Sequence, residues 1–280
     1  MNEFEKNPIF PKKIRECYDF IKQIAESVGL SRPFLISNSM IFLHKYFIYK
    51  IFSTTPPSNF LQELDKNHYD LINICIACFF ITTKSTWYAT RLSLILDKNL
   101  EENANKAKHR EQVIFYEYDI LSSINFNLEN DLPYKYAKSL WEDVAKAIYQ
   151  KYKDDKILKD IKEKWSSFIL YSYLFPFFLK FDSPVLALAN LDIVFQYYDI
   201  ELDLSQIISC HKELELTSKT SVEVCSALID RLIISNEKLT IIKKNEPNNK
   251  NEKIINLNIQ KIHVNTDAYQ EKIKELKSDS

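Results

Sequence analysis

The stretch that decides the fold is residues 71–83, LINICIACFFITT, which contains no charged residue. Its apolar side chains would fall on every face of a helix, and a helix of that kind belongs in the middle of a protein core. The other long uncharged stretch, residues 165–179, contains Pro176. Both are shorter than the roughly 18–20 apolar residues that cross a bilayer. We therefore expect two buried helices and no membrane span.

Glycine is almost missing from the chain, because Gly29 is the only one among 280 residues. Phosphate-binding loops and dinucleotide folds need glycines where the backbone approaches phosphate closely. Tight two-residue hairpins also depend on glycine. Hydrophobic residues make up 46% of the chain, which is enough for a sizeable core. These features exclude the nucleotide-binding loops and predict an all-α fold.

Helical periodicity, prolines and polar caps divide the chain into helices. The expected helices are residues 12–28, 33–51, 69–84, 107–124, 133–152, 156–175, 183–198, 204–210 and 222–234. Gly29 follows the first helix, at the position where a left-handed residue is wanted. The order of helices after Pro133 resembles the order before it. We therefore expect two similar units, residues 31–131 and 132–235, between an N-terminal segment, 1–30, and a polar tail, 236–280, with one possible further helix.

The chain is balanced in charge and carries five cysteines. Lys and Arg number 37 and Asp and Glu number 38. This balance gives no general reason to expect binding to nucleic acid or to an anionic membrane. The odd number of cysteines, without disulfide-type spacing, favours a reducing compartment.

Catalytic and metal-binding patterns are missing from the sequence. Cys75 and Cys78 form a C-x-x-C, which can be a redox pair or half a zinc site. They lie in the apolar helix, and His68, the nearest histidine, is roughly 10 Å from Cys75 along the helix axis. We expect both thiols to serve packing, and His44 to be a satisfied buried or interface residue. We predict no catalytic residue, no metal site and no cofactor.

A carboxylate interrupts the apolar stripe of the helix expected over residues 107–124. The stripe consists of Val113, Ile114, Ile120, Leu121 and Ile124. Glu117 lies three or four residues from these side chains and therefore on the same face. A carboxylate buried there without a partner would be costly. The face is therefore either open to solvent or covered by a molecule that supplies hydrogen-bond donors.

Lys84 is the second unusual charge, because it ends the apolar helix on the face of Phe80 and Ile81. It could simply stabilise a helix C-terminus and reach water. If Lys84 and Glu117 border one apolar surface, they could instead clamp the backbone ends of a partner helix. The ammonium would then bind carbonyl groups and the carboxylate would bind amides.

At these residues the chain resembles the cyclin family. Residues 74–84, ICIACFFITTK, and 113–128, VIFYEYDILSSINFNL, are similar to two segments of the first cyclin box, and residues 42–48, FLHKYFI, resemble its first helix. Residues 179–191, LKFDSPVLALANL, are similar to a segment of the second repeat. The four segments occur in the family's order within residues 12–235. Many cyclins follow the lysine with an acidic pair, whereas this chain has Ser85, Thr86 and Trp87.

The resemblance implies two tandem five-helix cyclin-box repeats and a non-catalytic protein that activates a cyclin-dependent Ser/Thr kinase. It implies that Lys84 and Glu117 bind the kinase's regulatory helix and the loop beside it. Leu121, Phe126 and Leu128 would form the apolar floor under that helix. YEYDILSSINFNL followed by LPY, residues 116–128 and 132–134, is most similar to cyclin H among the transcription-type cyclins H, C, K, T and L.

For partners, the resemblance implies a cyclin-dependent kinase and, for a protein similar to cyclin H, a third assembly-factor subunit. It implies a nuclear protein that can also be cytoplasmic, without direct contact to nucleic acid or membrane. The alternative from another class is a promoter- or polymerase-binding module like general transcription factor B, which uses cyclin-like repeats. That alternative would favour a markedly basic face and often a zinc ribbon, and the net charge of -1 and the missing cysteine pairs count against it.

Overall fold

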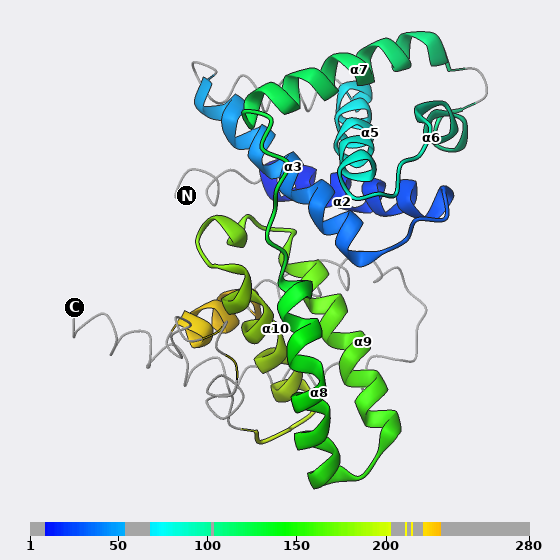
Figure 1. Ribbon diagram of the computed structural model, residues 1–280. Coiled ribbons are helices and arrows are strands. Elements are labelled where there is room, and N and C mark those ends of the chain that lie inside the picture. The colour runs from blue at the N-terminus through cyan, green and yellow to red at the C-terminus, as the bar shows by residue number, and fades with distance from the viewer. Residues whose placement is uncertain are drawn as a thin grey trace, which may run out of the picture. The chain divides into compact units, whose positions relative to one another are not determined.

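The computed structural model describes residues 9–53, 68–101, 104–202, 211, 214 and 221–230. In these residues all regular structure is helical and no strand occurs (Figure 1), so the all-α prediction is confirmed. The elements are α2 (Ile9–Ser27), α3 (Pro33–Ser53), α5 (His68–Ser85), α6 (Leu92–Asn99), α7 (Lys106–Ser123), α8 (Pro133–Tyr152), α9 (Asp155–Ser172), the 3-10 helix η1 (Phe177–Leu179) and α10 (Ser183–Tyr197). Residues 221–230 are also helical.

Most of these helices were predicted from the sequence. The first residue of α8, Pro133, and its last, Tyr152, are the ones predicted. Helix α9 ends at Ser172, three residues before the predicted end, and a turn and η1 follow. The predicted helix over residues 204–210 and the polar tail lie outside the described residues.

Two compact units make up the chain. Unit 1 consists of Met1–Lys135 and Ser166–Lys180, and unit 2 of Tyr136–Trp165 and Phe181–Ser280. Helix α9 therefore contributes to both units, its first part to unit 2 and its last turns to unit 1. The assignment of cyclin-type repeats to residues 31–131 and 132–235 stays a prediction.

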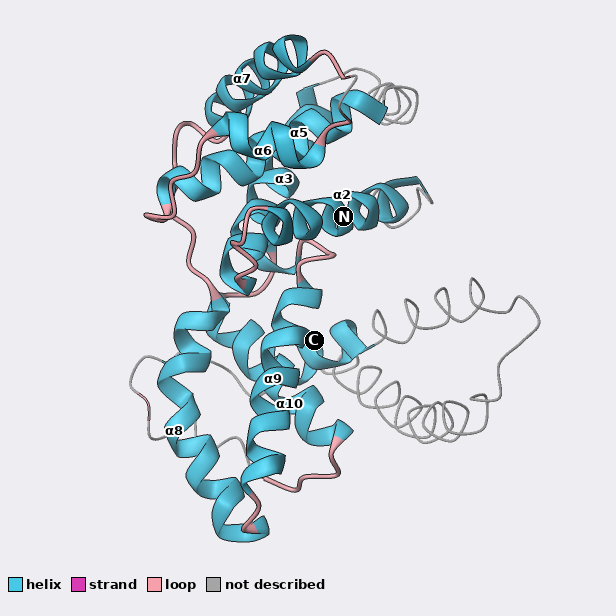
Figure 2. Cartoon of the chain, turned by 90° about the vertical axis from the view of Figure 1, so that its right-hand side faces the viewer, coloured by secondary structure: helices cyan, strands magenta, loops and turns pink. Residues whose placement is uncertain are grey.

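Helix α5 is the centre of unit 1. It packs against α2, α3 and α7, as Figures 1 and 2 show. Its middle residues Ile76, Ala77, Cys78 and Phe79 are completely buried. The expectation that the stretch over residues 71–83 forms a buried helix is therefore confirmed.

Gly29 ends α2 in a left-handed conformation with φ +71°. The Gly29 amide donates to the Glu26 carbonyl at 3.1 Å, and the Leu30 amide donates to the Ala25 carbonyl at 2.8 Å. This is the Schellman arrangement, which satisfies carbonyls that the helix end would leave free. The predicted role of Gly29 is confirmed.

Helix α10 is the apolar centre of unit 2, and nearly all its residues from Ser183 to Phe195 are buried. Trp165 of α9 donates its indole N–H to the Ala187 carbonyl at 2.9 Å. The Ser226 hydroxyl donates to the Ala189 carbonyl, also at 2.9 Å. No helix of the described residues is both long enough and apolar enough to span a bilayer.

Candidate functional site

Lys84 and Glu117 meet on the surface of unit 1. Lys84 lies in the last turn of α5 and Glu117 in α7, and the ammonium donates to Glu117 Oε1. The Lys84 side chain is 47% exposed and that of Glu117 is 15% exposed. The Lys84 nitrogen also lies 4.4 Å from the centre of the Phe80 ring. The structure thus brings together the two charges that the sequence singled out.

The apolar stripe predicted for α7 is not one face. Val113 and Ile120 are completely buried, whereas Ile114 is exposed. Neighbouring positions on a helix are about 100° apart, so a stripe containing both Val113 and Ile114 extends from the core to the outside. Glu117 lies at the boundary between the two sides. The single-stripe interpretation was wrong, because it merged a core face with an outer face.

The outer side of α7 carries large hydrophobic side chains in its second half, one turn after the exposed charges of Arg110 and Glu111. Tyr118 is 67% exposed, Phe115 is 63% exposed and Leu121 is half-buried. Single exposed apolar residues are ordinary, but a contiguous group marks an interaction surface. We define the outer face of α7 as Ile114, Phe115, Tyr118, Leu121, Phe126 and Leu128.

The end of α7 places Phe126 beside this helix. The Phe126 amide donates to the Leu121 carbonyl at 2.8 Å, while Asn125 and Phe126 have φ values of +52° and +55°. The Phe126 ring lies 6.4 Å from the Tyr118 ring in an edge-to-face arrangement. Phe126 and Leu128 are both exposed. The three residues predicted as an apolar floor, Leu121, Phe126 and Leu128, therefore lie in or just after α7 and reach solvent.

Phe115 and Tyr118 are the members of the outer face that the sequence reading missed. They occur three residues apart, outside the predicted apolar stripe of Val113, Ile114, Ile120, Leu121 and Ile124. Large apolar residues opposite a core stripe were the available signal, because that side of a surface helix is usually polar.

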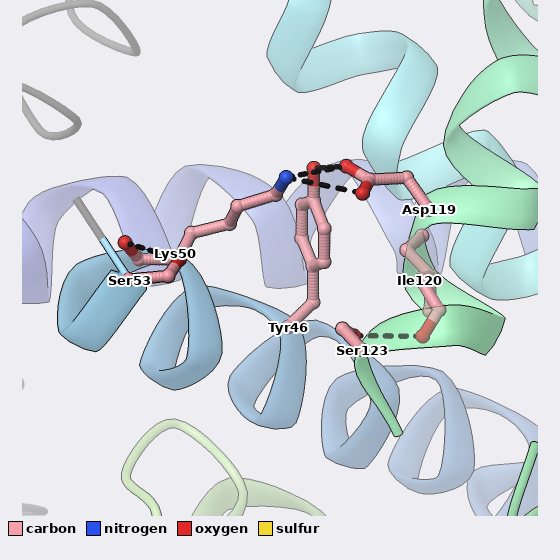
Figure 3. A network of polar contacts seen from close by, with 6 residues as sticks. All are labelled: Tyr46, Lys50, Ser53, Asp119, Ile120 and Ser123. Carbon is pink, nitrogen blue, oxygen red and sulfur yellow. Dashed lines mark hydrogen bonds and ion pairs between the residues drawn. The ribbon is translucent and has the colours of Figure 1, made fainter. Parts of the chain in front are cut away.

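A polar network holds α7 against α3, away from the outer face (Figure 3). The Tyr46 hydroxyl donates to Asp119 Oδ2 at 2.6 Å, and the Lys50 ammonium lies 3.0 Å from Oδ1 and 2.8 Å from Oδ2. Burial and the Asp119 carboxylate both raise the pKa of Tyr46, so its hydroxyl stays a donor. These contacts fix the rotation of α7 and therefore the direction of its outer face.

A second network joins the first half of α7 to α5. His109 Nδ1 and Asn73 Oδ1 are 2.8 Å apart, and the Asn73 amide donates to Gln112 Oε1 at 2.9 Å. Asn73 is completely buried, so these bonds satisfy a polar group that would otherwise be costly. Together the two networks make α7 a fixed platform.

His44 is completely buried in the core of unit 1, as expected, but it is only half satisfied, because its Nδ1 has no hydrogen-bond partner among the described residues. Its Nε2 lies 2.8 Å from the Tyr173 carbonyl, which can only accept, so Nε2 carries the proton. Burial lowers the pKa of His44 to about 4. The imidazole is therefore neutral at physiological pH and lies among aromatic rings, with Phe178 at 5.8 Å.

The predicted burial of Cys75 and Cys78 is confirmed, and Cys17 of α2 lies with them in the core. Burial raises the pKa of the Cys17 and Cys78 thiols. Buried thiols with raised pKa values are poor nucleophiles and ligands. Within the described parts of the chain, no group of three or more His, Cys, Asp or Glu is placed to hold a metal ion.

Comparison with protein-family models finds no family that matches this chain, and a search among curated proteins also finds no match. The geometry of unit 1 is therefore the basis for the functional argument that follows.

Proposed function

We propose that this protein is a cyclin-like, non-catalytic subunit that binds and activates a cyclin-dependent Ser/Thr protein kinase. The observation that carries this proposal is one surface of unit 1, where the Lys84–Glu117 ion pair borders the exposed aromatic outer face of α7. An apolar surface next to two opposite charges can receive one partner helix and bind its backbone ends. The resemblance to cyclins supplies the identity of that helix, the kinase's regulatory helix.

The ion pair gives both charges a partner while the protein is alone. When the kinase binds, the Lys84 ammonium would turn to carbonyl groups and the Glu117 carboxylate to amides of the regulatory helix and its neighbouring loop. Leu121, Phe126 and Leu128 would contact the helix from below. In the protein without its partner, Lys84 and Glu117 are paired with each other. No unpaired charge therefore lies beside the exposed aromatic side chains.

Activation follows from binding to one conformation of the kinase. A ligand that prefers the helix-in conformation shifts the population toward it. In that conformation the kinase's lysine–glutamate pair and its magnesium site are assembled. Loss of one desolvated charged contact at such an interface costs about 2–5 kcal/mol of binding.

We propose that the partner is a cyclin-dependent kinase of the transcription or kinase-activating type. Its substrate would be the C-terminal repeats of RNA polymerase II or the activation loop of another kinase. This proposal rests on the similarity of residues 116–128 and 132–134 to cyclin H. The proposal includes a nuclear location, with a cytoplasmic fraction, and a third assembly-factor subunit as in complexes of cyclin-H type.

The sharpest test exchanges the two charges. The double variant Lys84→Glu with Glu117→Lys keeps an ion pair in unit 1 but reverses its polarity toward a partner helix. We expect its thermal midpoint to stay within a few degrees of wild type, because the variant keeps an ion pair at this partly exposed position. We expect co-purification of the kinase to be lost, because each charge now faces backbone groups of the same sign. Lys84→Ala with Glu117→Ala should also weaken co-purification.

The matched control is the ion pair between Asp97 of α6 and Lys106 of α7, which is 2.9 Å long and also lies on the surface of unit 1. The double variant Asp97→Lys with Lys106→Asp should bind the kinase like wild type. Normal kinase binding by the Lys84–Glu117 exchange, or an equal loss in the control, contradicts the proposed interface.

A further inference from the structure

Trp87 occupies a backbone position that normally belongs to glycine. It is the second residue after α5 and has φ +64°. The same position after three other helices is left-handed too, and there the residues are Gly29, Asn125 and Asp199, with φ values of +71°, +52° and +51°. Glycine, asparagine and aspartate tolerate this conformation, whereas a bulky aromatic residue is a genuine outlier in it.

The Trp87 side chain packs against none of the described residues of unit 1. It is 98% exposed, so almost the whole indole lies in water. An apolar ring that stays in water contributes almost nothing to folding, and a left-handed backbone opposes it. Backbone strain that packing does not explain is typical of ligand and partner sites. The described residues therefore do not explain the conformation of Trp87.

The segment that carries Trp87 is held in place on both sides. Before it, the Thr86 hydroxyl donates to the Thr82 carbonyl at 2.6 Å. After it, the Tyr88 ring packs 5.6 Å from the Phe34 ring, and the Arg32 guanidinium lies 5.1 Å from the Tyr88 ring centre. The indole is thus presented from a fixed backbone, which lowers the entropy cost of binding a partner through it.

Trp87 is also close in sequence to the proposed kinase-binding surface, because it follows Lys84 by three residues. We propose that Trp87 is an aromatic anchor of that surface and that it determines which kinase binds, by entering an apolar pocket next to the kinase's regulatory helix. The inference rests on the proposed function and names a further contact of the same site. Exposed aromatic residues in the centre of interfaces, tryptophan above all, carry a large share of binding energy.

The charges around Trp87 indicate the rim of that pocket. Arg32 lies over the neighbouring ring and Arg91 is exposed four residues after Trp87. Arg91 is the one charged residue of 85–91, STWYATR. With one arginine over the ring that follows Trp87 and another four residues after it, the complementary pocket would be apolar with an acidic rim.

The test uses the full chain and the catalytic subunit of the cyclin-dependent kinase that co-purifies with wild type, purified alone. In Trp87→Gly the backbone can take φ +64° without strain. We expect the thermal midpoint to rise by at least one degree, while the Kd for the kinase increases at least tenfold. Trp87→Phe should keep the Kd within about threefold of wild type. The opposite directions of stability and binding distinguish an anchor from a structural residue.

Asp199→Gly is the matched control, because Asp199 has the same left-handed position after α10 in unit 2. Its Kd should equal that of wild type. Hydroxyl-radical footprinting gives a direct second readout, since trypsin releases residues 85–91 as one peptide with Trp87 as its only tryptophan. Oxidation of that peptide should fall at least fivefold in the kinase complex.

The outcomes separate the two proposals. Unchanged kinase binding by Trp87→Gly overturns the anchor, and so does a fall in its thermal midpoint together with the loss of binding. If the Lys84–Glu117 exchange abolishes binding in the same experiments, the proposed function stands without the anchor. If neither change affects binding, the proposed function itself fails.

Discussion

At Gly29, backbone conformation rather than packing determines which residue is tolerated. The φ value is +71°, and a Cβ placed there would meet no atom within 4 Å. Any penalty for a side chain must therefore come from the left-handed backbone alone.

We predict that Gly29→Ala lowers the free energy of unfolding by about 1 kcal/mol, since alanine favours this conformation less than glycine does. Gly29→Asn should cost clearly less, because asparagine tolerates the left-handed region. Urea denaturation followed by circular dichroism measures both values. Equal losses in the two variants would point to a steric effect instead.

His44 links stability to pH. Burial holds its folded-state pKa at about 4, below the ordinary value of 6.5. Between these values the unfolded chain binds a proton that the folded chain does not. The stabilisation is therefore complete above pH 6.5 and is lost as the pH falls toward 4.

We predict that this one histidine contributes a slope of about 1.4 kcal/mol per pH unit to unfolding between pH 6.5 and 4. His44→Gln is less stable at pH 7 but should lack this contribution, so its stability should fall less steeply over that range. Denaturant unfolding at several pH values compares the two slopes. Parallel slopes would show that His44 does not titrate differently in the two states.

At the scale of elements, α7 serves as a platform with one side in the core and the other exposed. Tyr46 and Lys50 of α3 hold it through Asp119. A helix held in this way keeps Glu117 beside Lys84 and keeps the outer face turned to solvent.

We predict that Tyr46→Phe lowers the free energy of unfolding by about 1–2 kcal/mol, because it removes a partly buried hydrogen bond to a carboxylate. Tyr49→Phe is the matched control on the same helix, since Tyr49 is exposed. It should change the free energy of unfolding by less than about 0.5 kcal/mol. Thermal and urea unfolding of both variants provide the comparison.

Local sequence patterns determine most of the helices, and they also explain what was missed. Pro133 and Gly29 mark a start and an end that the structure reproduces. Which side of α7 faces the core was not predictable, because both Val113 and Ile114 are apolar. That choice depends on α3 and α5, which lie far away in the sequence. The pairing of Lys84 with Glu117 was anticipated only as two charges beside one surface.

For the molecule as a whole, the least predictable feature is that unit 1 is built from two separate segments of the chain. Residues Ser166–Lys180 belong to it although they follow the first helix of unit 2. Tyr173 in this segment accepts the hydrogen bond of His44, and Tyr171 lies 6.2 Å from the Tyr18 ring. Contacts between residues more than a hundred positions apart cannot be predicted from helical periodicity.

We predict that a fragment ending at Lys135 is markedly less stable than unit 1 in the full chain. Without residues 166–180, His44 loses its acceptor and aromatic side chains of the core become exposed. The fragment should bind a hydrophobic dye and melt at least 10 °C below the full chain. A sharp transition at the temperature of the full chain would show that the segment contributes little.

The same segment has a consequence for synthesis on the ribosome. Chains grow at about 5–20 residues per second, so about 45 further residues after Lys135 take roughly 2–9 s. During that interval the nascent chain holds α2, α3, α5, α6 and α7 without the segment that covers His44 and Tyr18. Unit 1 is therefore synthesised first but can complete its core only after residues 166–180 have been added. A chaperone that binds the nascent chain would meet unit 1 with this core incomplete.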